Sequence, residues 1–236
     1  MDREEKARFI NRMFASIAGR YDLLNTILSF NRDKGWRRFA VSKAGLKEGS
    51  WALDVATGTG ELALELAREV APSGRVVGVD FCEEMLQVAR EKVKRGGHGG
   101  QIEFKAGRAE ALPFPEEVFD GATIGFALRN VTDIGAALRE MGRVVKKGGR
   151  VVVLEFTQPE NPVFRRAYYL YFFRILPLIG GLVSGRKEAY TYLPHSVLAF
   201  PTRAGLQGMM EEAGLRDVTI YPLTGGIVAV HVGTKV

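Results

Sequence analysis

An alternation of strand-like and helix-like segments between residues 51 and 156 limits the fold more than any other feature of the sequence. Short runs rich in β-branched residues, such as RVVGVD, are separated by stretches with apolar residues three to four apart. The expected strands are 51–57, 75–80, 101–107, 119–125 and 150–156, and the expected helices are 60–70, 82–94 and 133–145. This alternation predicts a parallel sheet with helices on both faces.

The segments outside this core have other patterns. Residues 1–48 show apolar positions at helical spacing and predict a helical cap in three pieces. Residues 157–200 predict a lobe beside the core that contacts the substrate. The final segment, 201–236, predicts one helix and two strands, and only Thr224 and Gly225 separate these strands. So short a connection predicts an antiparallel hairpin.

A doubly wound, mostly parallel sheet that closes with an antiparallel hairpin is typical of the class I S-adenosylmethionine methyltransferase fold. We therefore expect an α/β protein of this fold, with a cofactor-binding core at 49–156, a helical N-terminal cap and a lobe. A chain of 236 residues fits one such domain.

A glycine-rich loop follows the first expected strand, and it admits two cofactors. GTGELA at 58–63 matches the dinucleotide pattern G-x-G-x-x-G/A, with Asp80 about 20 residues further on. Asp54, just before the loop, distinguishes the two. A carboxylate there suits the positive charges of S-adenosylmethionine and would repel a pyrophosphate. Asp54 could also cap amides of the loop, and the two roles are compatible.

A polar turn at 107–120 follows the third strand, and in methyltransferases this turn holds the adenine ring. Its backbone amides can contact the edge of the base. We expect the cofactor, S-adenosyl-L-methionine, to contact residues from the loop, the second strand, this turn and the end of the fourth strand: Asp54, Gly58, Thr59, Gly60, Asp80, Phe81, Arg108, Ala109 and Gly125.

The composition excludes little. The net charge of +6 is compatible with several kinds of acidic partner, and we expect no nucleic-acid partner. Cys82 is the single cysteine, so an internal disulfide is excluded. No group of His, Cys or acidic residues has the spacing of metal ligands, and we expect no metal. The N-terminal segment lacks an apolar run of signal-peptide length, which favours a cytoplasmic protein.

Four segments resemble the ubiquinone/menaquinone biosynthesis C-methyltransferase family. The first, YDLLNTILSFNRDKGW at 21–36, matches a Y-D-x-M-N signature that ends in tryptophan. The second, RVVKKGGRVVVLE at 143–155, matches a signature with a central G-G and a final glutamate. IGFALRNVTD at 124–133 and YTYLPHSVLAFP at 190–201 resemble the menaquinone branch.

The chain departs from the family pattern at five positions. Leu24 replaces methionine, and Lys147 replaces proline in a turn. Asn31 and Asp33 replace the glycine and histidine of the ubiquinone-type pattern, so no role of that histidine carries over. Arg108 stands where the family has an aspartate or asparagine beside the adenine. The side-chain acceptor is lost, so the backbone of Arg108 and Ala109 would contact the adenine instead.

The resemblance implies C-methylation of a polyprenylated quinol, with demethylmenaquinol converted to menaquinol and the ubiquinone precursor benzoquinol as the alternative. It also implies catalytic roles for Arg129, Tyr21 and Asp22. Arg129 stays protonated, so it would hold a developing phenolate or orient a water. Tyr21 and Asp22 would transfer protons or close the site. The resemblance leaves a homodimer open.

The mostly apolar segment VFRRAYYLYFFRILPLIGGLV at 163–183 could be mistaken for a membrane span. Its three arginines argue against a span, and we expect Pro177 and the Gly180–Gly181 pair to break the helix. Two interpretations stay open. One is an amphipathic lobe that covers an apolar pocket or rests peripherally on the inner membrane face, and the other is a buried helix.

Two other functions are compatible with parts of the sequence. The glycine pattern with Asp80 would serve an NAD-dependent dehydrogenase, which calorimetry with S-adenosylhomocysteine and NAD would distinguish. A non-catalytic member of a quinone-synthesis complex could keep the same fold, and an activity assay would identify it.

Overall fold

The computed structural model describes residues 2–97, 99–179 and 187–236. In these residues one sheet of seven strands has the order β3-β2-β1-β4-β5-β7-β6. The strands are β1 Trp51–Val55, β2 Arg75–Asp80, β3 Ile102–Ala106, β4 Phe119–Gly125, β5 Val145–Phe156, β6 Leu215–Leu223 and β7 Val228–Lys235. β1 to β5 pair in parallel, and β7 is antiparallel to both β5 and β6. The predicted fold class is therefore confirmed, including the terminal hairpin, whose strands are joined by η4 (Thr224–Gly226).

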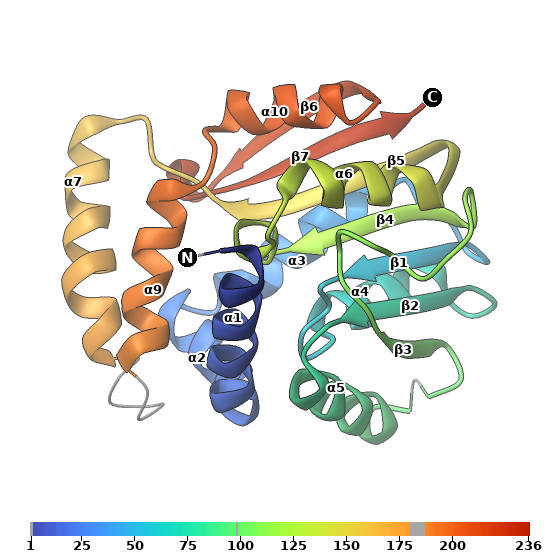
Figure 1. Cartoon of the computed structure of the whole chain (residues 1–236), viewed down its shortest axis with the longest axis horizontal. Helices are drawn as coiled ribbons and strands as arrows, with labels where there is room; N and C mark the ends of the chain where they lie inside the picture. The colour runs from blue at the N-terminus through green and yellow to red at the C-terminus, as the bar shows by residue number, and fades with distance from the viewer. Residues whose placement is uncertain (1, 98, 180–186) are drawn as a thin grey trace.

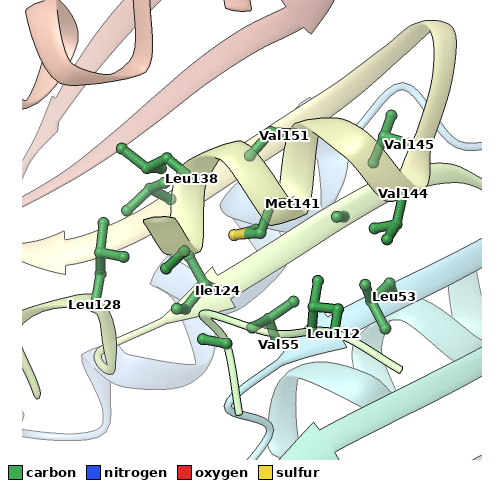
Figure 2. Close-up of a cluster of buried hydrophobic side chains, with 14 of the residues drawn as sticks. Leu53, Val55, Leu112, Ile124, Leu128, Leu138, Met141, Val144, Val145 and Val151 are labelled. Carbon is green, nitrogen blue, oxygen red and sulfur yellow. The ribbon is translucent and has the colours of Figure 1, made fainter. Parts of the chain in front are cut away.

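Helices cover both faces of the sheet, as Figure 1 shows. One face packs against α3 (Arg32–Lys43), α4 (Glu61–Val70) and part of α5 (Glu83–Arg95). The other face packs against α6 (Ile134–Val144) and α10 (Arg203–Glu212). Figure 2 shows Leu138 and Met141 of α6 beside Ile124 of β4 and Val151 of β5. Burying each such side chain contributes roughly 1.5–3 kcal/mol, so the core holds the strands, and the loops after them, in fixed positions.

The remaining helices gather at the carboxyl ends of the parallel strands, on the side to which the arrowheads of β1, β2 and β4 point in Figure 1. They are α1 (Arg3–Ile17), η1 (Ala18–Arg20), α2 (Tyr21–Leu28), η2 (Leu128–Asn130), α7 (Pro162–Leu170), the π-helical η3 (Tyr171–Ile175) and α9 (Lys187–Ala199). A cluster of buried apolar residues that includes Leu24, Tyr168 and Phe172 joins the cap to the lobe. Cap and lobe thus enclose one end of the sheet.

One expectation about local structure was only partly right, and another was wrong. The turn expected at Lys147–Gly149 is an irregularity inside β5, which begins at Val145: the pairing shifts from Phe119–Val145 to Gly121–Arg150, and Gly148 has φ +80°. Gly149 allows this because a Cβ there would stand 2.5 Å from the carbonyl oxygen of Asp120. Pro177 does not break the lobe helix, since residues 176–179 are helical and follow the π-helical turn. Gly180 and Gly181 lie outside the described residues. Within the described residues, no helix has both the length and the apolar character needed to cross a bilayer.

Candidate functional site

A cleft lies beyond the carboxyl ends of β1 and β4, where the strand order reverses and where α/β sheets bind ligands. Eight of the nine residues expected to contact the cofactor line it: Asp54, Gly58, Thr59, Asp80, Phe81, Arg108, Ala109 and Gly125. Gly60 is not among the lining residues. It precedes α4 with φ +81°, and a Cβ there would stand 3.0 Å from the ring of Phe104. Gly60 therefore affects the conformation of the loop without lining the cleft.

Asp80 fixes the loop through two backbone hydrogen bonds. Its Oδ2 accepts from the N–H of Gly58 at 2.8 Å, and its Oδ1 accepts from the N–H of Cys82 at 2.9 Å. Burial raises the pKa of Asp80, and the N–H donors oppose this rise. A carboxylate has about four acceptor positions, so Asp80 can still accept from ligand hydroxyl groups.

Asp54 is buried at the base of the cleft, and its partners differ from those expected. Its carboxylate accepts from the hydroxyl groups of Thr57 at 2.6 Å and Thr123 at 2.9 Å, and no loop amide donates to it among the described contacts. Burial raises the pKa of Asp54 to about 7, although both hydroxyl groups lower it. An anion held at this cost would gain from a cationic ligand in the cleft.

These acids make the cleft suited to S-adenosylmethionine. Asp54 and Asp80 offer carboxylate oxygens to positive and hydroxyl-bearing groups. Gly58 has φ +55°, and a Cβ there would meet no atom within 4 Å, so the loop leaves space for a ligand to approach the backbone. These carboxylate oxygens can accept hydrogen bonds from the hydroxyl groups of a ribose and can pair with a positively charged group.

The turn after β3 lines one end of the cleft. Arg108 Nη1 contacts Glu4 of α1 at 3.2 Å, so its side chain is directed towards the cap helix. Glu110 accepts from the N–H and the hydroxyl group of Thr132, at 2.7 and 2.6 Å. Ala109 is buried beside them. The turn is thus held from both sides.

A second cavity, of about 400 Å³, adjoins the cleft and is lined mainly by aromatic and aliphatic side chains of the cap and the lobe. Four residues line both spaces: Phe14, Tyr21, Arg37 and Phe126. We call the second space the acceptor cavity. A reacting group in it would face a methyl donor in the cleft.

Arg129, one of the expected catalytic residues, lines the acceptor cavity and is buried, with 6% of its side chain exposed. Its Nη1 donates to Glu155 at 2.7 Å and to the carbonyl oxygen of Phe126 at 2.5 Å. Its guanidinium lies 5.4 Å from the centre of the Phe156 ring. Its Nε is buried and has no hydrogen-bond partner.

The hydroxyl group of Tyr168 is also buried without a partner, and Tyr168 lines the same cavity. Buried polar atoms are rarely left unpaired, because an unmade hydrogen bond costs about 1–3 kcal/mol. Arg129 and Tyr168 therefore supply two unused donors to an otherwise apolar space. That pair suits a ligand with an apolar body and oxygen acceptors.

Tyr21 and Asp22 have different surroundings. Tyr21 lines both spaces, and burial raises its pKa, so its hydroxyl group keeps its proton. Asp22 lines neither space. It accepts from the hydroxyl group of Thr59 at 2.5 Å and pairs with Lys92 at 2.6 Å. Neighbouring residues on a helix point about 100° apart, and here Asp22 is directed to the loop and α5 while Tyr21 lines both spaces.

Three residues that the sequence did not single out as catalytic line the acceptor cavity: Asp33, Arg37 and Tyr168. Asp33 and Arg37 form a buried ion pair at 2.5 Å, and their i,i+4 spacing was the signal that could have revealed them. Tyr168 had no such signal, since aromatic residues surround it in the sequence.

Trp36, Cys82 and the histidines also have chemically notable side chains. Trp36 is buried and lines the acceptor cavity, and its Nε1 donates to Thr224 at 2.9 Å. Burial lowers the pKa of His231 to about 4 and raises that of Cys82 to about 12. His195 is exposed on the lobe, and His98 lies outside the described residues. In the described part of the chain no group of three or more His, Cys, Asp or Glu could hold a metal ion.

The model of the ubiE/COQ5 methyltransferase family matches residues 1–235. A relative from a Geobacter species, named ubiquinone/menaquinone biosynthesis C-methyltransferase UbiE, is 51% identical over 231 residues, which cover 98% of each chain. Relatives of the same name from Hahella chejuensis and Cronobacter sakazakii are 46% and 44% identical, and the matches cover 93% of each relative.

Solved structures agree on the fold. A methyltransferase from Aquifex aeolicus, described as dependent on S-adenosylmethionine, aligns with a TM-score of 0.62 at 21% identity, over 85% of this chain and 89% of that one. A methyltransferase from Thermotoga maritima, described as a histamine N-methyltransferase candidate, aligns with a TM-score of 0.64 at 21% identity, over 95% and 99%.

These matches exclude the dehydrogenase alternative for the glycine loop. The family and the class I fold together make S-adenosylmethionine the cofactor of this chain. With the family model matched over nearly every residue and relatives about half identical throughout, the chain belongs to the ubiE/COQ5 methyltransferase family.

Proposed function

We propose that the chain methylates a ring carbon of a polyprenylated quinol, and that its substrate is demethylmenaquinol. The relatives' name and the resemblance of 124–133 and 190–201 to the menaquinone branch support this choice. The observation that carries it is the acceptor cavity: an apolar space that shares four residues with the cofactor cleft and contains an unpaired Arg129 Nε.

When bound, S-adenosylmethionine supplies a methyl group on positively charged sulfur. We propose that the eight predicted contact residues that line the cleft bind it, with Asp54 facing its positive charge. Tyr21 and Phe126 then separate the two spaces and exclude water, while Arg129 donates from Nε to the ring oxygen beside the reacting carbon. Tyr168 donates to the opposite ring oxygen. Orientation and a dry, preorganised pocket supply most of the rate.

Asp22 has a supporting role in this proposal. Its contacts with Thr59 and Lys92 join α2 to the cofactor loop and to α5. We therefore assign Asp22 to closure of the cap over the cofactor, and not to proton transfer.

We also propose that the lobe and α2 rest on the membrane that holds the polyprenyl tail. Leu23, Ile27 and Phe30 of α2 and its C-terminal turn are 55%, 40% and 75% exposed, and Leu170 and Leu178 of the lobe are 62% and 60% exposed. The rings of Phe30 and Tyr171 are 5.9 Å apart, so the two exposed sets are neighbours. Both Phe30 and Tyr171 line the acceptor cavity.

The test is mass spectrometry of quinols after incubation with methyl-labelled S-adenosylmethionine. Demethylmenaquinol should gain one labelled methyl group, and the benzoquinol precursor of ubiquinone should gain it more slowly. Arg129→Lys should lower kcat/KM by at least tenfold, whereas Arg139→Lys, an exposed change on α6, should have no effect. No mass gain on either quinol would refute the proposal.

A further inference from the structure

Asp33 occupies an unusual position for a carboxylate. It lies in the first turn of α3, is 5% exposed and lines the acceptor cavity. Its Oδ1 accepts from the hydroxyl group of Ser29 at 3.0 Å, and its Oδ2 accepts from Arg37 at 2.5 Å. Burying a charge in an apolar space is costly even when it is paired, so its presence needs a reason.

Among the described residues that line this cavity, Asp33 is the single carboxylate, and none is a histidine. The arginines there remain protonated in proteins. Burial raises the pKa of the lining tyrosines, which therefore keep their protons: Tyr21, Tyr168, Tyr171 and Tyr192. Asp33 is thus the one described lining group of a type that commonly serves as a general base.

The surroundings of Asp33 leave it able to accept. A carboxylate has about four acceptor positions, and Ser29 and Arg37 use two of them. Arg37 also lines the cofactor cleft, and its guanidinium lies 5.8 Å from the centre of the Phe126 ring. Since Phe126 lines both spaces, Asp33 stands one side chain away from the junction where the methyl group must pass.

We propose that Asp33 is the catalytic base that takes the proton of the quinol hydroxyl group, an inference that rests on the proposed function. As the ring carbon bonds to the methyl carbon, the methyl–sulfur bond breaks and its electron pair stays on sulfur. The hydroxyl oxygen becomes a carbonyl and gives its proton to Asp33. Once the methyl transfer is complete and water enters the cavity, the ring loses its C–H proton to water, and Asp33 returns its proton to the oxygen. One proton is released in total.

The timing of this transfer explains why a carboxylate is sufficient. A phenol-like hydroxyl group has a pKa of about 10, as tyrosine has, so a carboxylate would hardly ionise it in the resting complex. As the carbon attacks, however, the hydroxyl group becomes that of a protonated carbonyl, which is a strong acid. The transfer is then favourable in the transition state, where general-base catalysis contributes about 10²–10⁴ in rate.

The test compares wild type and Asp33→Asn on a series of demethylnaphthoquinols whose hydroxyl groups differ in acidity through ring halogenation. With the unsubstituted quinol, kcat/KM of the variant should fall by about 10²–10⁴. With the most acidic quinol, which is already ionised in the assay buffer, the deficit should shrink to less than tenfold. A deficit that stays the same along the series would overturn the proposal, because a positioning role does not depend on substrate acidity.

Two further variants keep the test decisive. Asp33→Asn leaves Arg37 buried without its partner, so binding of S-adenosylhomocysteine and Tm are measured first. If that variant is unfolded, the double variant Asp33→Asn/Arg37→Gln, which removes both charges, is put through the same series under the same criterion. Asp217→Asn, an exposed change, is the matched control and should keep wild-type rates throughout. If wild type itself methylates none of the quinols, the proposed function fails, and that result is distinct from an unchanged deficit.

Discussion

At the scale of single residues, the cofactor cleft is built around two buried acids with different tasks. Asp80 is used by the protein itself, since its oxygens hold the loop amide of Gly58 and the start of α5 at Cys82. Asp54 accepts only from two threonine hydroxyl groups among the described contacts and has a pKa of about 7. The charge state of Asp54 should therefore respond to a cation in the cleft.

Binding of S-adenosylmethionine should release a proton from Asp54 at pH 6 to 7. The cation favours the ionised carboxylate, so binding lowers a pKa that starts near 7. Calorimetry in buffers of different ionisation enthalpy should detect release of most of one proton at pH 6 and little at pH 8. Asp54→Asn should bind at least tenfold more weakly at pH 8 and release much less. Equal release by both proteins would contradict the assignment.

The same residue predicts how the stability of the ligand-free protein depends on pH. A carboxyl group whose pKa is raised on folding stabilises the fold below its unfolded value of 3.8, and this contribution is lost as pH rises through about 7. Asp54→Asn should therefore be more stable than wild type at pH 8, by roughly 2 kcal/mol, and lose this advantage near pH 4. Urea unfolding at the two pH values measures the difference.

Tyr168→Phe should separate activity from stability. The hydroxyl group has no partner in the ligand-free protein, so its removal should leave Tm unchanged or higher. The stacking on Phe172, with ring centres 4.8 Å apart, remains. Loss of a hydrogen bond to the quinol should lower kcat/KM about threefold to tenfold. Tyr169→Phe is the control: its hydroxyl group donates to Gln158 at 3.0 Å, so that variant should lose stability and keep its activity.

At the scale of elements, α2 is fastened to the cofactor site by a chain of polar contacts. Asp22 of α2 accepts from Thr59 in the loop, and Lys92 of α5 bridges Asp22 and Glu61 of α4, each at 2.6 Å. Three helices and the loop are therefore coupled, and the helix that carries Tyr21 is held against the cleft by them.

Lys92→Met should loosen this connection, because it leaves Asp22 and Glu61 as neighbouring acids without their shared cation. We expect the affinity for S-adenosylmethionine to fall about threefold to tenfold and the amides of 21–28 to exchange hydrogen faster. Arg95→Met, on the same helix, removes an exposed pair with Glu91 and should change the affinity less than twofold. If both variants bind S-adenosylmethionine with the same affinity, the contacts of Lys92 do not hold α2 against the cofactor site.

At the scale of the whole molecule, the sheet and its order of elements could be predicted because strands and helices have local periodicities. The cleft could be predicted in part, because Asp54, Gly58 and Asp80 follow strands whose carboxyl ends meet at one edge. The acceptor cavity could not, since it joins α2 and α3 to a lobe more than 100 residues away in the sequence. The burial of Asp33 and the unpaired Tyr168 result from that packing, and the direction of Asp22 results from its contacts with Thr59 and Lys92.

The exposed apolar residues of α2 and the lobe predict how the protein meets a bilayer. Leu170→Asp and Leu178→Asp should reduce cosedimentation with vesicles that contain anionic lipid and raise KM for long-tailed quinols, while S-adenosylmethionine affinity stays unchanged. Val236→Asp is the matched control, because Val236 is 63% exposed at the C-terminus, away from the lobe (Figure 1). Unchanged KM in the lobe variants would show that this face does not receive the substrate.

The proposed function depends above all on the quinol ring binding in the acceptor cavity beside the cofactor cleft. A crystal structure with S-adenosylhomocysteine and demethylmenaquinol would show where the ring lies. We expect the ring between Tyr21 and Arg129, with one ring oxygen about 3 Å from Arg129 Nε and the tail leaving past Phe30. A ring bound outside this cavity, or one that leaves Arg129 Nε unpaired, would contradict it.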